Sequence, residues 1–368
     1  MNSFYELGLL PTLQATLDAQ RITRPTEIQA RAMPELLAGR SVVGVAETGS
    51  GKTLAYALPI LHKIKSLEES GSPVTAESAP RAVVLVPSRE LGEQVARVFK
   101  TFTHDTRLRV RMALGGVDLL KSRENVKGAF EVLVATPGRL GQLVERKIVS
   151  LSDVRMMVLD EADQLLDLGF LPQAGDLVNA TPAGRQLALF TATLPPPVAR
   201  LAQRTFNMPV ELRSRGSHRP VSTLHTINRR IVDGRRFEQL QVELATPNEG
   251  GTLLFTNTRE QCDKVVAQLA RIKRPCAVFR GEMDRVERRV NLKRFRDGEV
   301  DLLIATDLGA RGLDIEHVGR VINYNLPSRV DNYLHRAGRT ARAGRTGVVI
   351  NFVSERDQAL IKELERLG

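Results

Sequence analysis

Short apolar runs and longer amphipathic stretches alternate along the whole chain. In the first half, runs rich in β-branched residues span 41–46, 81–87, 108–114, 131–137, 155–160 and 186–192. A second series spans 251–256, 276–280, 300–307, 320–327 and 347–353. Strands of a parallel sheet are buried on both faces and read as continuous apolar runs, with helices between them. The pattern predicts an α/β fold with mainly parallel sheets flanked by helices.

A tract without apolar periodicity separates the two series. Residues 207–223 are rich in Pro, Gly, Ser and Arg, a composition typical of a linker. The chain has 368 residues, more than one hydrophobic core usually supports. We therefore expect an N-terminal domain over 1–207, a linker over 208–223 and a C-terminal domain over 224–368. The two halves are expected to share one architecture.

The charge balance and the cysteine content narrow the choice of partner. Lys and Arg number 53 against 42 Asp and Glu, a net charge of +11, which favours nucleic acid before an acidic membrane. Cys262 and Cys276 are too few for a zinc site, and such sparse use fits a reducing compartment. The longest apolar runs fall short of the about 18 residues of a membrane span. The N-terminus lacks a signal-peptide pattern, so we expect a cytoplasmic protein.

The run at 41–46 leads into a glycine-rich loop, AETGSGKT at 46–53, and then an amphipathic stretch. Glycines let backbone N–H groups converge on the β- and γ-phosphates of a nucleotide at a helix N-terminus. The lysine supplies a point charge and the threonine a hydroxyl for Mg²⁺. Ala46 stands where the general pattern has its first glycine. The order of strand, loop and helix predicts a nucleotide site formed by Thr48, Gly49, Ser50, Gly51, Lys52 and Thr53.

Three acids follow the buried apolar run at 155–159, namely Asp160, Glu161 and Asp163. Buried carboxylates are costly unless something pairs them. We expect their strand to neighbour the strand of the glycine-rich loop. Asp160 would then bind Mg²⁺ through water, and Glu161 would polarise the attacking water. The alternative is a helix N-terminal turn in which the helix dipole favours acids, an alternative that is stronger for Asp163.

With the glycine-rich loop, DEAD at 160–163 resembles the DEAD-box ATP-dependent RNA helicases of superfamily 2, in a minimal bacterial-type form. Further segments resemble the family's motifs in order, and together they run from Phe4 to about residue 354. These segments are RPTEIQ (24–29), PSREL (87–91), GG (115–116), TPGRL (136–140), TAT (191–193), LLFTNTR (253–259), ATDLGARGLDI (305–315) and HRAGRTARAGR (335–345). The resemblance implies two RecA-like domains joined by a flexible linker, with ATP and Mg²⁺ as cofactors.

The resemblance also implies roles for residues at the ATP site. Arg339 and Arg342, three apart and expected on one helical face, would act on the γ-phosphate as arginine fingers; by themselves they would indicate a solvated basic helix. Phe4 would stack on the base that Gln29 recognises, and Gly312 and Asp314 would meet the γ-phosphate and the ribose. Coupling between the domains is implied for Asp163, Thr191, Thr193, Arg311 and His335. We expect His335 to be a structural contact and not a general base.

RNA contacts are implied for Arg89, Gly116, Thr136, Arg139, Arg288 and Thr306. Glycine and threonine suit contacts to phosphates rather than to base edges, which predicts little sequence preference. Each arginine alone would indicate only surface charge. Three positions depart from the family, with Ser88 for Thr, Thr191 for Ser and Arg285 for Gln. Arg285 replaces an acceptor by a pure donor, which puts RNA contact at that position in doubt.

We expect an RNA-stimulated ATPase that separates short RNA duplexes locally or remodels RNA–protein complexes. It would work on single strands and short duplexes, as a monomer, and without a membrane. A DNA helicase is one alternative, and stimulation by RNA or by DNA would decide between them. A nucleotide-gated RNA clamp that nucleates an assembly is another. The intact Lys52, Glu161, Arg339 and Arg342 weigh against an inactive enzyme.

Overall fold

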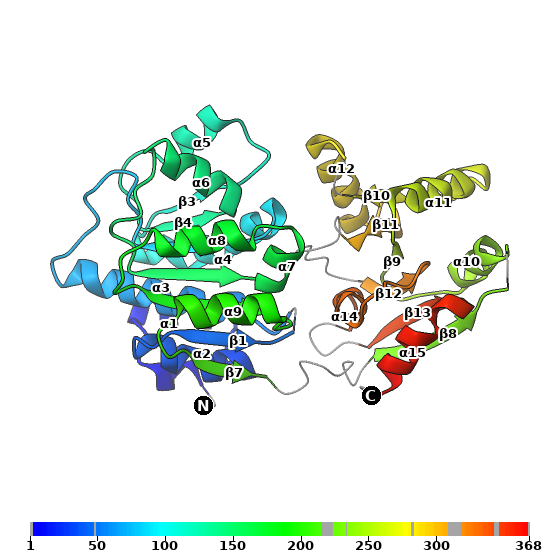
Figure 1. Cartoon of the computed structure of the whole chain (residues 1–368), viewed down its shortest axis with the longest axis horizontal. Helices are drawn as coiled ribbons and strands as arrows, with labels where there is room; N and C mark the ends of the chain where they lie inside the picture. The colour runs from blue at the N-terminus through cyan, green and yellow to red at the C-terminus, as the bar shows by residue number, and fades with distance from the viewer. Residues whose placement is uncertain are drawn as a thin grey trace. The chain divides into compact units, whose positions relative to one another are not determined.

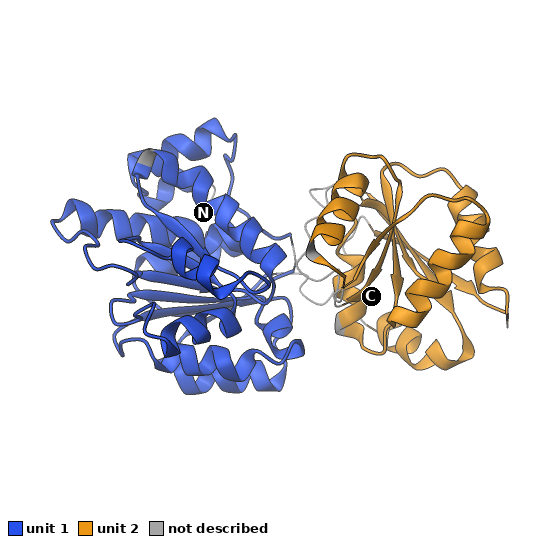
Figure 2. Cartoon of the chain, turned by 90° about the horizontal axis from the view of Figure 1, so that it is seen from above, with its two compact units in different colours: residues 1–217 blue, residues 218–368 orange. Residues whose placement is uncertain are grey.

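The computed structural model describes residues 3–47, 49–214, 224–232, 234–280, 283–307, 318–341 and 346–366, and only the backbone at 105, 285 and 331. The chain divides into two compact units, Met1–Ser217 (unit 1) and His218–Gly368 (unit 2) (Figure 2). The division falls inside the stretch 208–223, which was expected to be the linker. No helix among the described residues has the length and apolar character that a bilayer crossing requires.

Unit 1 is built on a seven-stranded sheet in the order β3-β4-β2-β5-β6-β1-β7, with all its pairs parallel (Figure 1). Its strands are β1 (Val42–Val45), β2 (Ala82–Leu85), β3 (Val110–Ala113), β4 (Val132–Ala135), β5 (Met156–Asp160), β6 (Gln186–Thr191) and β7 (Val210–Arg213). Its helices are η1 (Phe4–Leu7), α1 (Pro11–Ala19), α2 (Glu27–Leu37), α3 (Lys52–Glu69), α4 (Arg89–Thr106), α5 (Leu119–Asn125), α6 (Pro137–Glu145), α7 (Ala162–Asp167), α8 (Leu171–Asn179) and α9 (Pro196–Thr205).

Both faces of this sheet are apolar and covered. Successive strand side chains point to opposite faces, so Val84 and Val158 join the core under α1 to α4, whereas Val83 and Met157 join the core under α6 to α9. Apolar residues at every strand position are therefore required on both sides of the sheet. This explains why the strands read as continuous runs and not as alternating ones.

Unit 2 contains a six-stranded parallel sheet in the order β10-β11-β9-β12-β13-β8. Its strands are β8 (Leu224–Arg230), β9 (Gly251–Thr256), β10 (Ala277–Phe279), β11 (Leu302–Thr306), β12 (Val318–Asn323) and β13 (Gly347–Val353). Its helices are α10 (Arg236–Ala245), α11 (Arg259–Arg271), α12 (Arg285–Arg296), α14 (Val330–Ala337), η2 (Glu355–Asp357) and α15 (Gln358–Glu365). The shared α/β architecture confirms the expected fold class.

Two strands were not expected from the sequence. Val210–Arg213, assigned to the linker, pairs with β1 as β7, and Leu224–Arg230 pairs with β13 as β8. Both strands lie at the edge of a sheet. An edge strand has a neighbour on one side only and tolerates polar side chains, and β8 reads LHTINRR. Neither segment therefore carries the apolar run that marks a buried strand.

Candidate nucleotide and RNA site

The glycine-rich loop connects β1 to α3, as the sequence predicted. Gly49 and Gly51 both adopt φ +88°, in the left-handed region, and Gly51 is the N-cap of α3. The Nζ of Lys52 donates to the carbonyls of Ala46 (2.7 Å) and Glu47 (2.9 Å), so the lysine fastens its own loop. The first N–H groups of α3 have no intrahelical acceptor and suit an anion. Thr48 lies outside the described residues.

Gln29 ties the start of α2 to this loop. Its Oε1 accepts from the backbone N–H of Thr26 (2.9 Å), and its Nε2 donates to the carbonyl of Gly51 (3.0 Å). A primary amide has two N–H groups and two oxygen lone pairs, so one of each is left for a base. A Cβ added at Gly51 would lie 2.4 Å from this Nε2. The contact explains why the loop has glycine here.

Phe4 does not present an open ring. Its side chain is 1% exposed and belongs to the core of unit 1 with Leu13 and Leu17. Stacking on a base, which the family resemblance implied, requires an uncovered aromatic face. The described structure therefore does not support that role for Phe4, because the ring is used in packing.

Asp160 ends β5, but its strand is not the neighbour of β1 that the sequence analysis expected, because β6 lies between them. The side chain is 2% exposed. Its Oδ2 accepts from the hydroxyl of Tyr56 (2.7 Å) and its Oδ1 from the backbone N–H of Glu161 (2.9 Å). Burial raises the pKa of Asp160, and the positive charge of Lys52 opposes that rise. Tyr56 and Lys52 both come from α3, the helix that follows the phosphate loop.

Tyr56 was missed by the sequence analysis. It is fully buried, and burial with the nearby charge of Asp160 holds its pKa well above the ordinary value. A hydrogen bond from Thr53 acts in the other direction. Tyr56 lies four residues after Lys52, one helical turn along the same face. The spacing places Tyr56 on the face of α3 that carries Lys52, but its partner Asp160 is set by the fold.

Asp163 joins the acidic segment to the TAT segment. Its Oδ2 accepts from the backbone N–H (2.9 Å) and the hydroxyl (3.1 Å) of Thr193, and its own N–H donates to the Thr191 hydroxyl (3.2 Å). Glu161, 6% exposed with φ +48°, accepts a hydrogen bond from the Gln164 amide. α7 begins at Ala162, so these acids also occupy a helix start, as the alternative held. The structure thus brings Asp163, Thr191 and Thr193 together within unit 1.

Four of the predicted RNA residues surround one loop of unit 1. Arg89 Nη1 donates to the carbonyl of Gly115 (3.4 Å), whose own N–H donates to the Thr136 hydroxyl (3.0 Å). Arg139 donates to the carbonyl of Val117, and its Nη1 is buried without a partner among the described residues. Gly116 lies in the loop with φ +73°. Two guanidinium groups and a glycine turn at one place suit a phosphate backbone.

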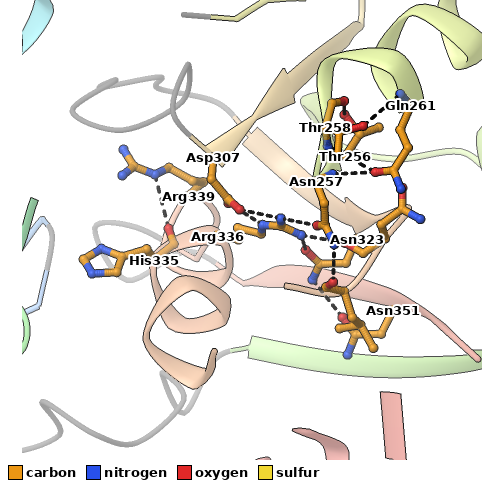
Figure 3. Close-up of polar contacts among 12 residues, drawn as sticks. Thr256, Asn257, Thr258, Gln261, Asp307, Asn323, His335, Arg336, Arg339 and Asn351 are labelled. Atoms are coloured by element: carbon orange, nitrogen blue, oxygen red, sulfur yellow. Dashed lines mark hydrogen bonds and ion pairs between the residues drawn. The ribbon is translucent and has the colours of Figure 1, made fainter. Parts of the chain in front are cut away.

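The predicted residues of unit 2 lie on several elements. Thr306 ends β11, and the Arg288 guanidinium lies 4.7 Å from the Phe279 ring. Arg339 was expected to lie on a helix, on the same face as Arg342. It lies instead beyond the end of α14 at Ala337, in a segment where the φ of Ala341 is +56°. The Arg339 Nε donates to the carbonyl of His335 (3.2 Å; Figure 3).

Several predicted positions lie outside the described residues. These are Arg311, Gly312, Asp314 and Arg342, together with the side chain of Arg285.

Two parallel-sheet units, one with a phosphate loop whose following helix is bonded to a DEAD segment, define a helicase-type nucleotide-binding protein. The family model for DEAD/DEAH box helicases matches residues 26–201, and that for the helicase conserved C-terminal domain matches residues 235–344. The chain belongs to the DEAD-box helicase family, and its two units are RecA-like domains.

The comparisons with individual proteins agree with this assignment. The DEAD-box ATP-dependent RNA helicase CshA of Bacillus cereus is 31% identical over 366 residues, with 100% of this chain and 68% of CshA covered. The probable ATP-dependent RNA helicase DDX46 of Homo sapiens is 34% identical over 380 residues, and the chain spans only 36% of its length. The structure of Saccharomyces cerevisiae Dbp5 bound to RNA and ADP BeF3 is 29% identical with a TM-score of 0.87, covering 100% of this chain and 93% of Dbp5.

Proposed function

We propose that the chain is an ATP-dependent RNA helicase in which RNA-stimulated ATP hydrolysis drives local, largely sequence-independent separation of short duplexes or remodelling of RNA–protein complexes. One observation carries the proposal. The acidic segment is bonded on one side to the phosphate-loop helix, through Asp160 and Tyr56, and on the other to the TAT segment, through Asp163 and Thr193. The names of the relatives, CshA and DDX46, support the same activity.

The donor groups at the loop fit Mg²⁺. Thr53 and Tyr56 interact, and Tyr56 in turn bonds Asp160. Each Asp160 oxygen has accepted one hydrogen bond and retains a lone pair for a metal-bound water. Mg²⁺ is commonly held through one or two carboxylates and several waters, so Thr53 and Asp160 would hold it. When bound it would neutralise phosphate charge, while Lys52 orients the phosphates and Glu161 polarises water.

The RNA role rests on the loop at 115–117. Arg89 and Arg139 both donate to its carbonyls, which places two cations at one glycine turn. The buried Nη1 of Arg139 has no hydrogen-bond partner among the described residues, so a donor remains that a small shift of the loop would bring to a phosphate oxygen. Contacts of this kind position a strand without reading its bases.

The test is ATP hydrolysis by the purified full chain with single-stranded RNA, with DNA of the same sequence and with neither. We expect stimulation by RNA and little by DNA. A Lys52→Ala variant, which lacks the ammonium group expected to bind the phosphates, controls for contaminating ATPases. Equal stimulation by DNA would replace the proposal by a DNA helicase, and RNA binding without any turnover would replace it by an RNA clamp.

Gln29 is expected to make the enzyme prefer ATP to GTP. Its remaining N–H and lone pair match the acceptor and donor on adenine's edge, whereas guanine offers two acceptors. Such a bidentate contact discriminates by about 1 to 3 kcal/mol, or roughly 5- to 150-fold. Gln29→Ala should therefore bring the ratio of kcat/KM for ATP and GTP close to one.

The ratio is the measurement because Gln29 also braces Gly51, and damage to the loop lowers both rates together. Gln173→Ala, on the exposed side of α8, is the matched control and should keep the native ratio. A variant at Gln29 that keeps the full preference for ATP would show that another group recognises the base.

A further inference from the structure

A row of hydrogen-bonded asparagine side chains crosses three strands of unit 2, buried at Asn323 and Asn351 and exposed at Asn228. Asn323 on β12, Asn351 on β13 and Asn228 on β8 lie at one register of the parallel sheet. The Nδ2 of Asn323 donates to the Oδ1 of Asn351, and the Nδ2 of Asn351 donates to the Oδ1 of Asn228, each at 2.8 Å. Asn323 and Asn351 are at most 1% exposed. We call these three residues the asparagine ladder.

Arg336, on α14, closes the ladder at its other end (Figure 3). Its side chain is 1% exposed, and its guanidinium lies 5.0 Å from the Phe255 ring. All five of its N–H groups have acceptors, since Nε and Nη2 donate to Asp307 (2.6 and 2.7 Å), Nη1 to Asn323 Oδ1 (3.0 Å) and the Asn325 carbonyl (2.7 Å), and Nη2 to Asn257 Oδ1 (2.8 Å). Arginine has five N–H donors, so this guanidinium is saturated.

The acceptors of Arg336 lie at the carboxyl ends of different strands. Asn257 follows β9, Asp307 follows β11, and Asn323 ends β12. Asp307 comes directly after Thr306, a predicted RNA residue. Arg339 lies two residues beyond the end of α14, the helix that carries Arg336. A single side chain therefore joins the strand end assigned to RNA with the helix next to the arginine assigned to the γ-phosphate.

Stability alone is a weak reason for such a group. A buried ion pair often contributes no more than apolar residues of the same volume, whereas fully bonded buried networks fix one arrangement of the elements they join. The buried Arg336 pairs with the partly exposed Asp307, and the asparagine ladder holds its other partner, Asn323. We therefore expect the network to fix the position of α14 relative to the strand ends that it joins.

We infer that Arg336 is a positioning residue, which together with the asparagine ladder holds α14 and Arg339 fixed relative to the RNA-contacting end of β11. The inference rests on the proposed function and extends it. With the two segments joined, RNA bound at Thr306 places Arg339 for hydrolysis. Without Arg336, RNA binding and nucleotide binding would both persist, but RNA would stimulate turnover poorly.

Unit 2 offers a matched control for a merely structural role. Arg320 is also buried (6% exposed), and its guanidinium donates to Thr252 Oγ1 and to the carbonyls of Glu243 and Thr246. These partners belong to β9, to α10 and to the residue that follows α10. Among the described residues, the hydrogen bonds of the Arg320 guanidinium go to β9 and to the end of α10, and not to α14 or β11. Replacing the Arg320 guanidinium removes hydrogen bonds of the same kind but leaves the contacts of α14 unchanged.

The experiment compares Arg336→Lys with Arg320→Lys in the full chain, at a temperature at which thermal melting shows both folded. Lysine keeps the charge but cannot reach acceptors on three strands from one nitrogen. RNA-stimulated kcat should fall about 10- to 100-fold in Arg336→Lys, the size expected for a misplaced group. It should stay within about twofold in Arg320→Lys, whose site is separate. Dissociation constants for ATP and for RNA should change by less than about threefold in both.

Hydrogen exchange gives a readout that does not depend on activity. Amides of 330–337 and 302–307 should lose protection together in Arg336→Lys and keep it in Arg320→Lys, because cooperative units open as one. Asn257→Ala, which removes one of the five bonds, should give the same pattern more weakly and carries the test if Arg336→Lys does not fold.

Two results would overturn the inference. The first is an equal loss of kcat in Arg336→Lys and Arg320→Lys. The second is unchanged exchange at 330–337 in Arg336→Lys. A native chain without RNA-stimulated turnover would instead contradict the proposed function, and the exchange data would still decide whether Arg336 fixes α14.

Discussion

Replacing Glu161 by glutamine should lower RNA-stimulated turnover by about 100- to 10,000-fold, the range that a positioned base contributes. ATP binding should persist, because the amide has the same shape and its oxygen can still accept the hydrogen bond of Gln164. What is lost is the negative charge that polarises water. The measurement is a single-turnover hydrolysis assay beside a titration with fluorescent ATP.

Asp176→Asn is the matched control, because it removes a carboxylate from the exposed face of α8 in the same unit. Its turnover and affinity should equal those of the native chain. If Glu161→Gln kept a rate within tenfold of the native one, the base would have to be sought elsewhere. An equal loss of turnover in both variants would show that removing any carboxylate from unit 1 slows the enzyme, wherever that carboxylate lies.

Gly51→Ala should weaken ATP binding by at least about tenfold, which corresponds to 1.4 kcal/mol. The residue has φ +88°, which costs an L-residue roughly 1 to 2 kcal/mol. Its Cβ would also lie 2.4 Å from the amide nitrogen of Gln29 and break the bond between α2 and the loop. Both effects move the N–H groups that face the phosphates. Titration of each variant with fluorescent ATP measures the loss.

Gly71→Ala separates the effect of backbone strain from the effect of the clash with Gln29. Gly71 has φ +89°, and nothing lies within 4 Å of the Cβ it would gain, so it carries backbone strain without a clash. Thermal unfolding should show a modest loss of stability and the titration no loss of affinity. A Gly51→Ala variant that binds ATP as well as Gly71→Ala would show that the contact with Gln29 does not shape the loop.

The buried strands could be predicted from the sequence, and the edge strands could not. A strand covered on both faces must be apolar at every position, and such runs located β1 and β5 within a few residues. β7 and β8 have one neighbour each and polar side chains, so a local pattern does not distinguish them from a linker. Their pairing depends on strands distant in the sequence.

The candidate site also has parts that could be predicted from local sequence patterns and parts that depend on tertiary contacts. The glycine-rich loop and the acids at 160–163 are local patterns, and the structure places them where α3 can reach Asp160. Tyr56 looks like an ordinary core aromatic until the fold sets it against Asp160. Phe4 was expected to face a base and is instead buried in the core. The burial of one ring and the partner of another are tertiary facts that no spacing encodes.

The asparagine ladder has a consequence for how unit 2 folds. In a sheet that is apolar on both faces, sliding one strand past its neighbour by a residue exchanges one apolar side chain for another, so burial specifies the alignment weakly. A slip of β13 would set Ile350 or Phe352 beside Asn323 and leave buried amides without partners. Each unpaired amide costs about 1 to 3 kcal/mol. The two buried amides, Asn323 and Asn351, therefore disfavour misaligned sheets that apolar burial alone would tolerate, and so select the native register as the sheet assembles.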